Sequence, residues 1–354
     1  MILQQLNFYF LLALSILSLA AAAPAPDPND DREISVYIVP GNETFPEGIA
    51  RQPNSPYFYV GSVTTGDIYR GNIHEKHLVH FLTGSTYGLA NAVGMKIDCR
   101  DRLYVAGGTT GTLFVFDLRT KKLLHRFSNG FVGMNVTLLN DLVIDEAGDV
   151  YVTDTVLPTL FRAKASEVNG PTVDLALEKW IDLTGTMGPG GNGIVVTEDQ
   201  RYLLVADIYA GEIWRVAISS RKVDKVDFGG VGIGQPDGLL IRDNILYSVN
   251  SLHEIGQFIR VIKMHPGYLS GTPVRSITSG LFERPSTAAF DGNDLLVVNF
   301  QFGVEIPVLP FTVYYGVDRG GGSVNDANVF QTINLIRLEE SNQLEVLEES
   351  KSSA

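Results

Sequence analysis

Cysteine is nearly absent from this chain, because Cys99 is the only one among 354 residues. No intramolecular disulfide can form, so the fold must be held together by buried apolar surface. The length allows this, since a chain of this size buries most of the surface that its unfolded form exposes. The segment around Cys99 has no counterpart elsewhere in the sequence, which favours a structural over a catalytic role for the thiol.

Basic residues are also scarce. The chain has 27 lysines and arginines against 40 aspartates and glutamates, a formal net charge of -13. Nucleic acids and anionic membranes bind through basic patches, so neither is expected as a partner. We expect a small-molecule substrate and a monomer instead. Part of the acidic excess lies in residues 24–33 and 339–354, which are predicted to be solvated ends.

Long apolar runs are confined to the start of the chain. The run from Leu11 ends in four alanines, and no lysine or arginine occurs before Arg32. This pattern predicts a signal peptide over residues 1–23, and therefore a secreted protein. An uncleaved anchor is the alternative, which the shortness of the run disfavours. The glycosylation sequons at Asn42 and Asn135 are compatible with secretion.

The sequence is rich, by contrast, in a repeated unit of two short strands joined by a tight turn, while long amphipathic helical patterns are hard to find. The residues that open the first strand of each unit lie 46, 47, 52, 45 and 49 residues apart: Glu47, Val93, Asn140, Asn192, Asp237 and Ser286. A period near fifty with paired strands is typical of a β-propeller, with one blade per repeat. The sequence therefore predicts an all-β, six-bladed propeller over residues 34–338.

Polar residues recur at equivalent positions of these units. The opening residues form a predicted inner ring. The second strands end in a predicted outer ring: Ser62, Gly107, Asp154, Asp207, Asn250 and Asn299. Because the two strands of a unit run antiparallel, both rings are expected at one mouth of the central channel.

The inner ring offers carboxylate and amide oxygens, from Glu47, Asn140, Asn192 and Asp237. Such oxygens suit calcium or another hard divalent cation, while the lack of histidine and cysteine in either ring argues against zinc. A channel filled with water is the alternative. For the outer ring, Asp154 and Asp207 are candidates for substrate binding, and the alternative is that they cap the following turns.

The order of these motifs resembles a known family. Pro46-Glu47-Gly48, Asn140-Asp141, Asn192-Gly193 and Pro236-Asp237-Gly238 follow one another as in the SMP-30, gluconolactonase and luciferin-regenerating-enzyme family of propellers. The resemblance implies that Glu47, Asn192 and Asp237 hold a divalent cation, normally calcium. It also implies that Asn140 contacts the substrate or a bound water, and that Asp237 acts as the general base in lactone hydrolysis.

One departure from the family pattern concerns the substrate. Sugar-lactone hydrolases of this family place an arginine two residues before the Asn-Asp asparagine, and this chain has Leu138 there. The change favours a more apolar substrate, with Tyr87, Tyr209, Phe300 and Phe302 as candidate aromatic contacts. Three functions stay open: a hydrolase of lactones or related esters, a ring-forming or isomerising enzyme of specialised metabolism, and a binding module without enzymatic activity.

Overall fold

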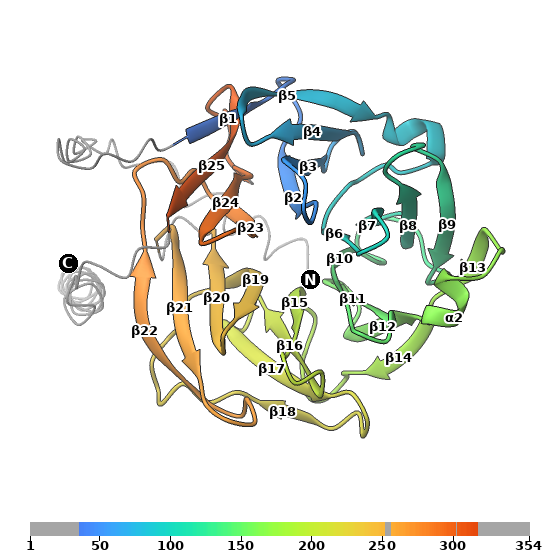
Figure 1. Ribbon diagram of the computed structural model, residues 1–354. Helices are drawn as coiled ribbons and strands as arrows, with labels where there is room; N and C mark the ends of the chain where they lie inside the picture. Colours follow the sequence, from blue (N-terminus) through green and yellow to red (C-terminus); the bar gives the residue numbers. More distant parts are fainter. Residues whose placement is uncertain (1–34, 252–255, 302, 318–354) are drawn as a thin grey trace, which may run out of the picture. The chain divides into compact units, whose positions relative to one another are not determined.

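The computed structural model describes residues 35–251, 256–301 and 303–317 (Figure 1). They belong to one compact unit that begins at Ile34. The predicted signal peptide and both acidic segments lie outside the described residues, as do Phe302 and residues 318–338 of the predicted propeller. These boundaries therefore stay predictions. Within the described part of the chain, no helix is long and apolar enough to cross a membrane.

The described strands form five hydrogen-bonded sheets around a common centre, one of eight strands, one of five and three of four, and the propeller class is confirmed (Figure 1). For description, the strands are grouped by antiparallel pairing into six successive sets of four; the number of six blades stays a prediction. The first three sets are β2 (Pro46–Arg51), β3 (Tyr57–Ser62), β4 (Ile68–Asn72) and β5 (Glu75–Leu82); β6 (Met95–Ile97), β7 (Arg102–Ala106), β8 (Thr112–Asp117) and β9 (Leu123–Ser128); and β10 (Leu139–Ile144), β11 (Val150–Asp154), β12 (Thr159–Ala163) and β14 (Glu178–Asp182).

The remaining sets are β15 (Gly191–Val196), β16 (Tyr202–Asp207), β17 (Glu212–Ala217) and β18 (Val223–Lys225); β19 (Pro236–Arg242), β20 (Ile245–Asn250), β21 (Phe258–Met264) and β22 (Gly271–Ile277); and β23 (Pro285–Asp291), β24 (Asp294–Asn299), β25 (Phe311–Val317) and β1 (Ser35–Val39). The short strand β13 (Asp174–Ala176) adds to the edge of β9. Two short helices, η1 (Gly84–Tyr87) and α2 (Ala165–Val168), lie in connections between strands.

The sixth set is closed by the first described strand of the chain. Strand β1 pairs antiparallel with β25, from Ser35 opposite Tyr315 to Val39 opposite Phe311. The two ends of the described propeller are thus held in one sheet by backbone hydrogen bonds. This closure joins the first and last repeats without a disulfide, as the single cysteine requires.

Glycines allow the inner strands of neighbouring sets to approach closely. A Cβ atom built on Gly48 would lie 1.8 Å from the Val93 carbonyl oxygen, and one on Gly193 would lie 2.4 Å from the Asp237 carbonyl oxygen. Both contacts are far below van der Waals distance, so no other residue fits without movement of the backbone. The close approach narrows the channel and brings the inner-ring side chains together.

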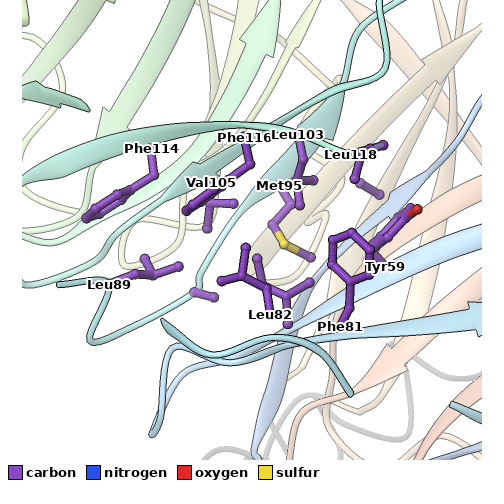
Figure 2. Packing of buried hydrophobic residues seen from close by; sticks show 13 residues of the cluster. Tyr59, Phe81, Leu82, Leu89, Met95, Leu103, Val105, Phe114, Phe116 and Leu118 are labelled. Carbon is purple, nitrogen blue, oxygen red and sulfur yellow. The ribbon is translucent and has the colours of Figure 1, made fainter. Parts of the chain in front are cut away.

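The core lies between adjacent sets and not within any one of them. Figure 2 shows the cluster between the first two sets, where Tyr59 and Leu82 meet Met95, Leu103 and Phe114. These side chains are at most 4% exposed. Complete burial of such a side chain contributes about 1.5–3 kcal/mol. The sets therefore depend on each other for stability, and this dependence holds the inner strands in fixed positions around the channel.

Candidate functional site

The inner ring exists, and each of its members is buried. Glu47, Asn140, Asn192 and Asp237 are 5–7% exposed, and each lies near the start of an inner strand. Glu47, Asn140 and Asn192 line one small cavity together with Lys96 and Asp141. Asp237 adjoins them, because it accepts a hydrogen bond from Asn192 and interacts electrostatically with Glu47.

The inner-ring residues lie at irregularities in strand pairing. In five sets, the pairing register between the first strand and its partner shifts at the ring position. The shift lies between Leu139 and Leu142 in β10, and between Pro236 and Leu239 in β19. A β-bulge of this kind places an extra residue on one strand and turns its side chain. Two successive residues, such as Asn140 and Asp141, can therefore both serve the channel.

Two buried oxygens of the ring have no hydrogen-bond donor. Glu47 Oε2 and Asn140 Oδ1 are without a partner among the described residues. The orientation of the Asn140 amide follows from its neighbour. The Thr155 hydroxyl donates its only hydrogen to the Gly191 carbonyl at 2.8 Å, so it accepts from Asn140 Nδ2 at 2.9 Å. Asn140 Oδ1 must then face the cavity, where it can serve a ligand.

Burial dominates the electrostatics of the two ring carboxylates. Loss of hydration raises the pKa of Glu47 well above its ordinary value, and the charges of Asp237 and Asp141 raise it further. Burial likewise raises the pKa of Asp237 to about 7, although hydrogen bonds from Ser251 and Asn192 oppose the increase. Two adjacent buried carboxylates are costly unless a proton or a cation compensates them.

The donor set fits a hard cation and not a softer transition metal. The ring contains no histidine or cysteine, the ligands that softer metals prefer. In the described ranges, no group of three His, Cys, Asp or Glu side chains is arranged to hold a metal ion of either kind by itself. The ring instead combines the Glu47 and Asp237 carboxylates with the amides of Asn140 and Asn192. Calcium binds such mixtures of carboxylate and carbonyl oxygens. The two oxygens without donors support this fit, because a cation would satisfy both.

The raised pKa values predict how the thermal stability of the protein depends on pH when no divalent cation is present. A carboxyl group whose pKa is higher in the folded state stabilises the fold at low pH, and this contribution is lost as the pH rises through the folded-state pKa. In cation-free buffer, the melting temperature of the wild type should therefore fall between pH 5 and 8 relative to that of Asp237→Asn. Thermal denaturation of both proteins checks this, and parallel curves would contradict the raised pKa of Asp237.

Two carboxylates of the outer ring, those of Asp154 and Asp207, accept hydrogen bonds from the backbone. Asp154 Oδ1 accepts hydrogen bonds from the backbone N–H groups of Leu138, Val156 and Leu157, at 2.9–3.0 Å. Asp207 Oδ1 accepts from the N–H groups of Tyr209 and Ala210. Both carboxylates are thus engaged in capping turns, as the alternative interpretation held. Substrate binding by Asp154 or Asp207 stays a prediction that these contacts do not support.

The residues predicted to contact an apolar substrate differ in their surroundings. Tyr87 is half-buried, and its ring packs against a core cluster on Phe116, with the ring centroids 5.1 Å apart. Tyr209 is 68% exposed on the turn that follows β16. Leu138 is half-buried two residues before Asn140, and a role in substrate binding stays a prediction. Asn42 and Asn135 are exposed, which is compatible with glycosylation and does not test it.

The structure adds two charged residues that the sequence interpretation left out of the site. Lys96 Nζ lies 2.9 Å from Asp141 Oδ1, and both residues line the cavity with Glu47. Asp141 belongs to the Asn-Asp motif, so its place in the sequence was a usable signal. The signal for Lys96 was its departure from the repeat, since the third residue after the ring position is apolar in the other five repeats.

Comparison with known proteins decides the family. Residues 45–298 match the SMP-30/gluconolactonase/LRE-like region. The chain belongs to this family. Its membership makes it a lactonase-like propeller, and the four inner-ring residues all lie within the matched segment. No curated protein sequence matches the chain.

Solved structures agree on the fold. A protein assigned as a gluconolactonase is 14% identical with a TM-score of 0.58, over 80% of this chain and 92% of its own. A gluconolactonase from Xanthomonas campestris is 16% identical with a TM-score of 0.56, over 78% and 87%. Streptogramin B lyase is 8% identical with a TM-score of 0.53, over 81% and 98%. At these identities the likeness establishes the fold and not the reaction.

Proposed function

We propose that this propeller is a secreted, calcium-dependent hydrolase of lactones or related esters, with a substrate more apolar than a sugar lactone. The observation that carries the proposal is the pair of buried oxygens without donors, Glu47 Oε2 and Asn140 Oδ1, beside the Asp237 carboxylate. Family membership supports a lactonase. Secretion rests on the predicted signal peptide alone.

Each ring residue has a part in this proposal. Glu47, Asn192 and Asp237 would hold the cation, which when bound polarises a lactone carbonyl and acidifies a water molecule. A carboxylate oxygen of Asp237 would accept the proton of the attacking water, since a carboxylate beside the water is the base that this hydrolysis needs. Asn140 Nδ2 is held by Thr155, so Asn140 Oδ1 stays directed at the ligand.

Apolar side chains around the mouth support an apolar substrate. Two connections on the mouth side, residues 129–138 and 300–310, carry exposed hydrophobic residues: Phe131, Val132, Met134, Val136, Ile306, Val308 and Leu309. The first connection is anchored, because the Thr137 hydroxyl donates to Asp154 Oδ2 at 2.5 Å. An acyl chain or ring that extends from the channel would meet these residues, whereas a small sugar lactone would not.

A panel of lactones and esters tests the proposal. Hydrolysis of six-carbon to twelve-carbon acyl lactones, aryl esters and a sugar lactone is measured on protein with calcium and on protein freed of it. Calcium-dependent hydrolysis that is fastest on apolar lactones is the expected result. Chelator-insensitive ring formation on an apolar metabolite, without hydrolysis, would replace the hydrolase with the cyclase. Tight binding of a substrate without any turnover would favour a binding module.

Leu138 is predicted to set part of this preference. In Leu138→Arg, the new guanidinium would bind substrate hydroxyl groups near Asn140, whereas an apolar substrate would remove its hydration without replacing it. The ratio of kcat/KM for a sugar lactone over an acyl lactone should therefore rise about tenfold. Leu138→Met is the matched control, since it keeps the apolar character and should leave the ratio unchanged. An unaltered ratio in the arginine variant would show that residue 138 does not contact the substrate.

A further inference from the structure

Lys96 is the only charged residue at its position in the repeat. The third residue after each ring position is apolar in the other five repeats, where it is Ala50, Val143, Val195, Leu240 or Ala289. A lysine at this place puts one positive charge on an otherwise apolar part of the inner strands. Its side chain is 32% exposed, and its ammonium group reaches Asp141 Oδ1 at 2.9 Å.

Asp141 is an exception as well. The residue directly after the ring position is Gly48, Gly94, Gly193, Gly238 or Thr287 in the other repeats, none of which is charged. The Asp141 side chain is 8% exposed. Its carboxylate is fixed by the backbone, because Oδ1 accepts from Leu142 N at 2.8 Å and Oδ2 accepts from Ile194 N at 3.3 Å. The two departures from the repeat thus meet in one ion pair, in which the aspartate is buried and the lysine is partly exposed.

The pair completes the charge balance of the cavity. Glu47, Asp141 and Lys96 line it, and Asp237 adjoins it. With the carboxylates ionised, three negative charges and one positive charge leave a net charge of minus two. A single divalent cation neutralises this charge. Without Lys96 the net charge of the cavity would be minus three. Charges at such short range and in a buried place interact strongly.

We propose that Lys96 is a fixed internal counter-ion of Asp141, which limits the inner ring to one divalent cation and weakens its affinity for trivalent cations. This inference rests on the cation site of the proposed function, and it assigns cation selectivity to two residues that are not ligands. Removal of the lysine alone leaves a buried aspartate uncompensated, which attracts cations; removal of the aspartate alone leaves a lysine that repels them.

Four proteins test the inference: the wild type, Lys96→Met, Asp141→Asn and the double variant. Calorimetric titrations with calcium and with lanthanum give the affinity and the number of ions bound. Lys96→Met should bind calcium at least about tenfold more tightly and gain still more for lanthanum, while Asp141→Asn should bind calcium at least about tenfold more weakly. The double variant, which restores the net charge, should return to within about threefold of the wild type.

The outcomes separate this inference from the proposed function. If the wild type binds calcium but Lys96→Met does not bind it more tightly and Asp141→Asn does not bind it more weakly, the role of Lys96 is overturned. The proposed hydrolase is unaffected by that result. Binding by Lys96→Met but not by the wild type would support the role of Lys96 and overturn calcium dependence. An absence of binding in all four proteins would overturn both. Where a single variant does not fold, Lys96→Arg keeps the charge and must keep the wild-type affinities, or the inference is wrong.

Discussion

Replacement of Asp237 by asparagine is expected to reduce lactone hydrolysis by at least about a hundredfold, because the amide can neither accept the proton nor supply a full negative charge to a cation. The substitution preserves the shape of the side chain, and Asp237 is buried with Ser251 Oγ 3.2 Å from Oδ2. The folded structure should therefore persist. The measurement is kcat/KM for the best lactone of the panel at saturating calcium.

Asp207→Asn is the matched control for this variant. Asp207 also follows a strand in the repeat frame, but its carboxylate caps a turn through Tyr209 and Ala210. The asparagine Oδ1 can still accept both hydrogen bonds, and asparagine caps about as well as aspartate. Its replacement should therefore change the melting temperature little and leave kcat/KM within about threefold of the wild type. Equal loss of activity in both variants would mean that the reaction does not depend on Asp237 as a base.

Removal of divalent cations should lower the melting temperature by about 4 °C. A ligand that binds only the folded state stabilises it by about 2.7 kcal/mol at a hundred times its Kd, and each kcal/mol corresponds to about 1.5 °C in a protein of roughly this length. In addition, removal leaves Glu47 and Asp237 buried next to each other, without compensation other than protons. Differential scanning calorimetry with calcium, with magnesium and after chelation provides the comparison.

The same experiment on Asp237→Asn identifies the site responsible. This variant lacks one of the two carboxylates, so its melting temperature should respond to chelation by less than half as much as that of the wild type. A full response in the variant would place the stabilising ion elsewhere in the protein. A wild type that melts at the same temperature with and without chelator, and contains no metal by elemental analysis, would rule out a bound cation.

The sequence by itself determined the fold and the composition of the inner ring. Spacing near fifty residues and paired strands predict a propeller, and radial order makes equivalent positions converge. Glu47, Asn140, Asn192 and Asp237 were therefore predictable as neighbours, although 190 positions separate the first from the last. Strand polarity also placed the outer ring on the same side, where Asp154 and Asp207 end β11 and β16.

Only the tertiary structure decided what each of these side chains contacts. The pattern does not distinguish a carboxylate that caps a turn from one that faces the channel, because both follow apolar strands. Only the structure shows that Asp154 accepts hydrogen bonds from backbone groups of two connections. The pattern likewise does not show what the Tyr87 ring contacts, and the structure packs it on Phe116 at the edge of the core. The Lys96–Asp141 pair joins two neighbouring repeats, and the two residues lie 45 positions apart in the sequence. Such contacts depend on bulges and on close approach between inner strands, which a period in the sequence does not encode.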